Sequence, residues 1–63
     1  MTPKAFCVLN HINVDEQFIN NLIETSISSK DLFNKIQDTF DTDVMMSDVK
    51  NLWDTYFSQY SDP

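Results

Sequence analysis

Cys7 and His11, the only cysteine and the only histidine of the chain, lie four residues apart. Residues at this spacing share one face of a helix, and a thiol beside an imidazole is a nucleophile paired with a general base. A second interpretation needs no chemistry, because cysteine is commonly buried as a small apolar side chain. We favour it, since a chain of 63 residues leaves little room for a pocket of about 300 Å³. We therefore predict that the protein is not an enzyme.

Four aspartates lie at and after the end of the second expected helix: Asp38, Asp41, Asp43 and Asp48. The run that starts at Asp41 resembles the opening of an EF-hand calcium loop, which also requires an oxygen ligand at its fifth position, glycine at its sixth and glutamate at its twelfth. These three positions hold Met45, Met46 and Leu52. One cysteine and one histidine supply only two of the four ligands of a structural zinc site. We predict no metal ion and no other cofactor.

Direct binding to nucleic acid is opposed by the charge of the chain. Ten acidic residues against four basic ones give a formal net charge of −6 at pH 7, and the basic residues are all lysines. Nucleic-acid phosphates need a basic surface, and arginine is the side chain that most often reads guanine. The expected layout is nevertheless similar to a helix-turn-helix domain, with residues 47–53 in the recognition position. A helix-turn-helix-like DNA-binding transcriptional regulator is therefore the alternative prediction.

The last expected helix carries the largest apolar face of the chain. Seven of its side chains recur at steps of one to four residues that fit a helix: Met46, Val49, Leu52, Trp53, Tyr56, Phe57 and Tyr60. We expect Trp53 and Phe57 to lie in the core. Because Tyr and Trp are enriched in interface hot spots, we expect Tyr56 or Tyr60 to stay partly exposed in a docking patch with one adjacent methionine. The predicted partner-binding residues are Met45, Met46, Asp48, Trp53, Asp54, Tyr56 and Tyr60.

The acidic surface suggests the kind of partner. Carboxylates spaced along helices can imitate the phosphates of nucleic acid and occupy the basic groove of another protein. We predict a small protein–protein interaction module, a regulator or inhibitor that binds a protein with a basic surface. The same face could also be buried in a homodimer. The lack of glycine and arginine is typical of an AT-rich genome, such as that of a phage or a mobile element.

The compartment follows from two absences in the sequence. A single cysteine excludes an intramolecular disulfide, which favours a reducing compartment. No run approaches the roughly 20 apolar residues that a membrane span needs. We expect a soluble, cytoplasmic protein with no membrane partner.

The candidate residues described above are expected to lie on, or next to, helices. Five apolar residues recur at helical spacing within residues 14–27: Phe18, Ile19, Leu22, Ile23 and Ile27. Asn13 can cap this helix, and Glu16 follows three positions later, as in a capping box. A second helix is predicted over residues 29–40, because Ser28 repeats the start signal. The last helix follows a turn at residues 41–43. It is capped either early, by Thr42 or Asp43, or late, by Ser47, in which case residues 44–46 are extended.

The N-terminal stretch fits two structures. Residues 6–9 favour a strand by side-chain type. Thr2 and Pro3 favour the start of a helix, and the same stretch carries a helical apolar stripe formed by Ala5, Val8, Leu9 and Ile12. We prefer the helix, since the chain offers no second strand with which to pair. The predicted fold is a single all-α domain over residues 1–63, a small bundle of three to four short helices.

Overall fold

The computed structural model of the protein describes the backbone of residues 1–60 and the side chains of residues 1–58. In this part of the chain there are four short helices. The helices are α1 (Pro3–Leu9), α2 (Glu16–Glu24), α3 (Ser29–Phe40) and α4 (Met46–Tyr60). No strand occurs in this part of the chain. The predictions of an all-α bundle of three to four helices, and of a helix at the N-terminal stretch, are confirmed.

The start of α1 follows from its first residues. The side-chain oxygen Oγ1 of Thr2 accepts a hydrogen bond from the amide of Ala5 at 3.1 Å. Pro3 occupies the first helical position, where a backbone amide has no partner within the helix. The side-chain cap therefore satisfies one of the amides that every helix leaves unpaired at its start.

The end of α1 is closed by a pair of backbone hydrogen bonds. The amide of His11 donates to the carbonyl of Val8 at 3.4 Å, and the amide of Ile12 donates to the carbonyl of Cys7 at 2.9 Å. This arrangement is a Schellman motif, which places one residue in the left-handed region. His11 is that residue, with a φ of 57°.

The structure corrects the direction in which α1 faces. Phe6 and Cys7 point into the core, whereas Val8 and Leu9 are 71% and 55% exposed. Apolar residues surround α1, so periodicity alone cannot choose the buried side, and the larger Phe6 removes more apolar area from water. The predicted inward stripe is wrong for the residues within α1. Its last member, Ile12, is buried because the Schellman motif turns the chain back toward the core.

α2 is shorter at both ends than predicted. Its N-cap is Asp15, two residues after the predicted cap Asn13. At the other end, the hydroxyl groups of Thr25 and Ser26 both donate to the carbonyl of Leu22, at 3.2 and 2.6 Å. Such side-chain hydrogen bonds compete with the backbone bonds that would continue the helix. The hydroxyl-rich connection therefore ends α2 earlier than its apolar pattern indicates.

α3 has the predicted bounds, because its start signal is local. The Oγ of Ser28 accepts a hydrogen bond from the amide of Asp31, and the carboxylate of Asp31 accepts one from the amide of Ile27, both at 3.1 Å. This reciprocal pair is close to a capping box, with aspartate in place of glutamate. The helix ends at Asp41, whose backbone is left-handed with a φ of 49°.

The junction between α3 and α4 is a short irregular segment, residues 42–45. Val44 is buried, so the segment packs on the core rather than forming a free loop. The carbonyl of Met45 accepts hydrogen bonds from the amides of Asp48 and Val49, both at 3.1 Å, which starts α4 at Met46. The observed start falls between the two predicted ones, two residues after the start that a cap at Asp43 predicts and two before the start that a cap at Ser47 predicts, which is within the one or two residues by which helix ends vary.

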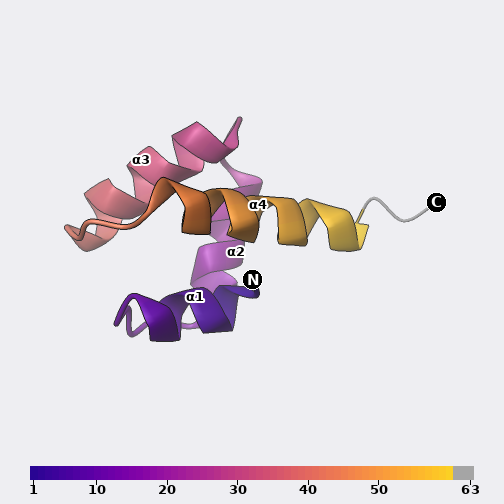
Figure 1. Ribbon diagram of the computed structural model, residues 1–63. Coiled ribbons are helices and arrows are strands. Elements are labelled where there is room, and N and C mark those ends of the chain that lie inside the picture. Colours follow the sequence, from indigo (N-terminus) through magenta and orange to yellow (C-terminus); the bar gives the residue numbers. More distant parts are fainter. Residues whose placement is uncertain (61–63) are drawn as a thin grey trace.

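All four helices contribute to one core. Its largest fully buried side chains are Phe6, Ile19, Ile23, Leu32, Ile36, Val49 and Leu52. α3 packs against α4, α2 packs against α1 and α3, and α1 also contacts α4. In Figure 1, α2 runs behind α4 and links α1 on one side to α3 on the other, while the last turns of α4 extend past the ends of both. One side of α4 is therefore covered by the bundle and the rest is accessible.

Candidate functional site

Three apolar side chains that are not fully buried lie along one side of α4. Met46, Trp53 and Phe57 are spaced by seven and four residues, which places them within about 40° of one another around the helix at 100° per residue. Trp53 is half-buried against the core, whereas Met46 and Phe57 are exposed. We call these three residues the α4 strip. The strip lies on an accessible side of the longest helix, and between Met46 and Trp53 it is interrupted by Lys50, which is four residues after the one and three before the other.

Ring contacts hold the C-terminal part of the α4 strip in place. The rings of Trp53 and Phe57 lie 4.5 Å apart between centroids, and the ring of Tyr56 meets that of Phe57 edge-on at 5.2 Å. The hydroxyl of Tyr56 donates a hydrogen bond to the carboxylate of Glu24, at the end of α2. A ring held by neighbours loses less conformational freedom when a partner covers it. Phe57 is therefore a preorganised contact.

The structure reverses the predicted roles of two neighbouring aromatic residues. Tyr56 is 8% exposed and belongs to the core, whereas Phe57, which was predicted to be buried, is 40% exposed. The inward row of α4 is formed by Val49, Leu52 and Tyr56 at steps of three and four residues. Phe57 is one residue further along and so points about 100° away from that row. The surface position of Phe57 was not predicted, although its spacing of four residues from Trp53 and eleven from Met46 places it on their side of the helix.

The other predicted binding residues are distributed around the start and the outer face of α4. Met45 precedes the helix and is exposed, next to Met46 of the strip. Asp54 is exposed and borders the strip, while Asp48 is half-buried and lies roughly 160° around the helix from Met46. The side chain of Tyr60 lies outside the described residues. The structure therefore brings Asp54 to the strip and places Asp48 on another side.

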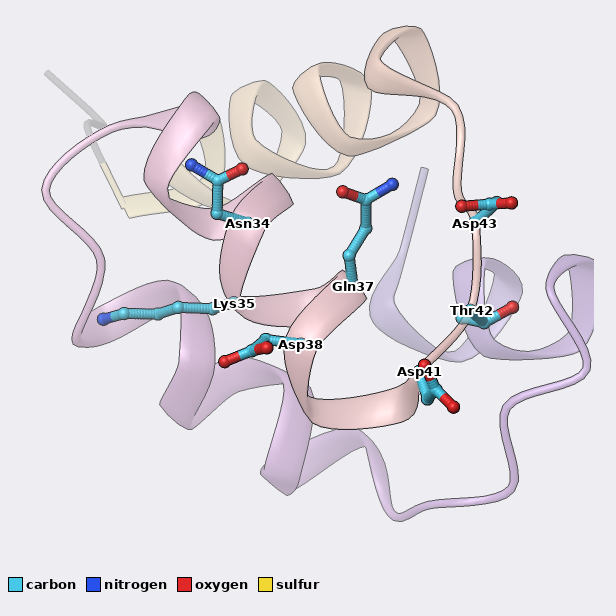
Figure 2. Close-up of a pocket in the computed structure, with 7 residues that line it drawn as sticks. All are labelled: Asn34, Lys35, Gln37, Asp38, Asp41, Thr42 and Asp43. Atoms are coloured by element: carbon cyan, nitrogen blue, oxygen red, sulfur yellow. The ribbon is translucent and has the colours of Figure 1, made fainter.

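A shallow hollow with three carboxylates lies where α3 ends (Figure 2). It is lined by Asn34, Lys35, Gln37, Asp38, Asp41, Thr42 and Asp43. The side chain of Lys35 extends away from Asp41 and Asp43, and its ammonium group donates to the carbonyl of Thr25 and lies 3.5 Å from the carboxylate of Asp31. Within the described residues, the hollow's three aspartates have no ion-pair partner.

We call Asp38, Asp41 and Asp43 the acidic hollow. In residues 1–58, no group of three or more histidine, cysteine, aspartate or glutamate side chains is arranged to hold a metal ion. The hollow also lies just before the start of α4 in the chain, so it adjoins the end of the helix where the α4 strip begins. Its geometry is that of an open negative surface rather than an enclosed cation site.

Cys7 and His11 do not share a helix face. Cys7 is buried in the core, and burial raises the pKa of its thiol above the ordinary value of 9.0, because desolvation disfavours the thiolate. His11 is exposed and lies beyond the end of α1, in the left-handed turn. The structure therefore does not arrange the two side chains as a nucleophile and its base.

Comparison of the chain with protein-family models, with curated proteins and with solved structures finds no match in any of the three. None of the helices in the described part of the chain is both long enough and apolar enough to span a bilayer.

Proposed function

We propose that the protein is a non-enzymatic interaction module, a small regulator or inhibitor that docks on a cationic surface of another protein. The docking surface consists of the α4 strip with the acidic hollow at one end. One observation carries the proposal: the contacting rings of Trp53 and Phe57 are accessible on a helix whose start directly follows carboxylates that have no ion-pair partner within the described residues. Within the α4 strip only Trp53 packs against the core, whereas Met46 and Phe57 are exposed and belong to no part of it.

The apolar part of this surface supports affinity. Trp53, Phe57 and Met46 are residue types that interfaces favour over the rest of a protein surface. Because Trp53 and Phe57 contact each other and Tyr56, their rings are ordered before a partner arrives. The entropic cost of association is correspondingly smaller. A partner is expected to place its own apolar side chains over these two rings.

The charged part of this surface supports the choice of a cationic partner. Residues 41–63 hold five aspartates and one lysine, and the whole chain has a net charge of −6. A field of one sign raises the association rate of an oppositely charged partner and repels a like-charged one. Lys50 lies beside the strip, three residues before Trp53. Its positive charge repels a cationic partner, so removal of this charge should strengthen binding, whereas removal of a nearby carboxylate should weaken it.

The proposed regulatory role rests on competition, because a partner whose basic groove is covered can no longer bind its own ligand there. A basic groove that binds nucleic acid can be occupied by carboxylates placed where phosphates would lie. The acidic hollow and Asp54 supply such groups beside an apolar row that nucleic acid lacks. Docking of this kind would block the groove, which is the action of an inhibitor.

The experiment uses the fluorescence of Trp53, the only tryptophan of the chain. The probes are an amphipathic helical peptide of leucine and lysine and a matched peptide of leucine and glutamate. We expect the lysine peptide alone to change the fluorescence, and Phe57→Ala to weaken its binding about tenfold, equivalent to about 1.4 kcal/mol. Lys50→Met is expected to strengthen binding, and a double change of Asp41 and Asp43 to asparagine to weaken it.

Ile27→Ala is the matched control, because Ile27 is a highly exposed apolar residue in the connection between α2 and α3. Equal binding of both peptides, or an equal effect of Ile27→Ala and Phe57→Ala, would contradict the proposal. A duplex DNA oligonucleotide is titrated in parallel. Micromolar binding at about 0.15 M salt that falls steeply as salt rises would instead support the helix-turn-helix alternative.

A further inference from the structure

α1 has an apolar outer face that no part of the described chain covers. Ala5, Val8 and Leu9 are exposed, while Phe6 and Cys7 on the opposite side of the same helix are buried. Apart from Lys4, α1 is apolar on both its inner and its outer side, a pattern typical of a helix that is buried on both sides. The outer face of α1 therefore has the character of an interface, and it belongs to a different helix from the α4 strip.

A groove runs beside this outer face, between α1 and the segment that leads into α2. It is lined by Lys4, Cys7, Val8, Ile12, Asn13, Val14, Asp15 and Glu16. Its apolar lining comes from side chains such as Ile12 and Val14, and its charged groups are of both signs. Lys4 lies on α1, whereas Asp15 and Glu16 lie at the start of α2.

This combination is self-complementary. An interface between two copies related by a two-fold axis uses the same surface twice, so that surface must carry both halves of every contact. The α1 surface does so, because an exposed apolar residue, Val8, lies at a partly apolar groove whose lining also includes a cation, Lys4, and two anions, Asp15 and Glu16. We propose that two copies of the chain pair through this surface, with Val8 of each copy in the groove of the other and Lys4 of each opposite Glu16 of the other.

The distribution of charge favours a second copy here over a foreign partner. Two chains of net charge −6 repel each other across most of their surfaces. The α1 surface and its groove carry charges of both signs, Lys4 from α1 and Asp15 and Glu16 from the start of α2, so two copies can meet here with opposite charges facing each other. Pairing through α1 leaves the α4 strip free, so the dimer is independent of the proposed docking function. Because the covered area is that of one short helix and its groove, the dimer is weak.

The first test is sedimentation equilibrium of the intact chain from about 10 μM to about 1 mM, the range that reveals a weak dimer. We expect the mass to rise from one chain toward two. Val8→Asp should weaken the dimer at least tenfold, and it does not threaten the fold because Val8 is largely exposed. Phe57→Asp, on the α4 strip, is the matched control and should leave the dimer unchanged.

The second test exchanges charges between copies. Lys4→Glu and Glu16→Lys should each reduce dimer formation, because each variant paired with itself opposes two like charges. An equimolar mixture of the two should dimerise more strongly than either variant alone, because both contacts of the mixed dimer join opposite charges. Circular dichroism confirms that each variant remains helical.

Three results would overturn the proposal. One is a mass of a single chain at every concentration. Another is a dimer that Phe57→Asp abolishes and Val8→Asp leaves intact. The third is a mixture of Lys4→Glu and Glu16→Lys that associates no more than its components.

Discussion

The hydroxyl of Tyr56 donates a hydrogen bond to the carboxylate of Glu24, which joins the end of α2 to the C-terminal half of α4. The same tyrosine ring supports Phe57 edge-on from the core side. One buried residue therefore connects the packing of the bundle to the ordering of the α4 strip.

Tyr56→Phe is expected to destabilise the fold, because it removes the hydroxyl and leaves the ring. The lost hydrogen bond has a charged acceptor, for which about 1.5–3 kcal/mol is typical, and exposure of Glu24 to water reduces the expected cost to about 1 kcal/mol. Urea denaturation measures the change. A double-mutant cycle with Glu24→Ala isolates this pair from other contacts of Tyr56. Additive effects in the cycle would show that the two side chains are not coupled.

His11→Gly is expected to stabilise the protein. His11 is left-handed at the end of α1, where a β-carbon costs about 1–2 kcal/mol and glycine has no such penalty. This stabilisation is partly offset, because glycine raises the conformational entropy of the unfolded chain. The net stabilisation should be about 0.5–1 kcal/mol. Thermal denaturation followed by circular dichroism measures it.

Asn10→Gly is the matched control for His11→Gly. Asn10 has a negative φ of −103°, and its side-chain amide donates to the carbonyl of Phe6 at 2.9 Å. Glycine at this position relieves no strain and removes a hydrogen bond, so it should lower the melting temperature. A rise for both variants, or a fall for both, would contradict the assignment of the Schellman motif.

Cys7 should make stability depend on pH in the alkaline range. Burial raises the pKa of its thiol in the folded state above the ordinary value of 9.0, so the folded protein holds this proton more tightly than the unfolded chain. The resulting stability is fully present below the unfolded pKa and is lost as the pH rises through the folded pKa. Urea denaturation between about pH 8 and pH 10.5 should show this loss, and Cys7→Ala should reduce it.

The reactivity of Cys7 provides a second measurement of the same property. A thiolate-specific reagent at neutral pH should react much more slowly with the folded protein than with the protein in denaturant, because only the thiolate attacks and the side chain is buried. Equal rates in the two conditions would show that the thiol is accessible.

The sequence predicts the helix starts with local caps well and the orientation of the helices poorly. The caps at Thr2 and Ser28 each involve a hydrogen bond to a residue three positions away, so the local sequence contains the whole signal. The side on which a helix is buried depends on residues distant in the chain. In α4, Tyr56 and Phe57 are both large aromatic residues; Tyr56 is the one turned inward, in register with Val49 and Leu52 and hydrogen-bonded to Glu24 on α2. The α1 stripe is misplaced for the same reason, since neither side of that helix is polar.

Leu52→Ala and Phe57→Ala should affect stability and binding in opposite order. Leu52 is fully buried, and removal of such a side chain typically costs about 2–5 kcal/mol. Phe57 is 40% exposed and contacts mainly Trp53 and Tyr56, so its truncation should cost less than about 1.5 kcal/mol. Binding of the lysine peptide should be weakened more by Phe57→Ala than by Leu52→Ala, when it is measured at a temperature where Leu52→Ala remains folded. A larger loss of stability for Phe57→Ala would mean that Phe57 belongs to the core, and the α4 strip would then have no aromatic contact to offer beyond the half-buried Trp53.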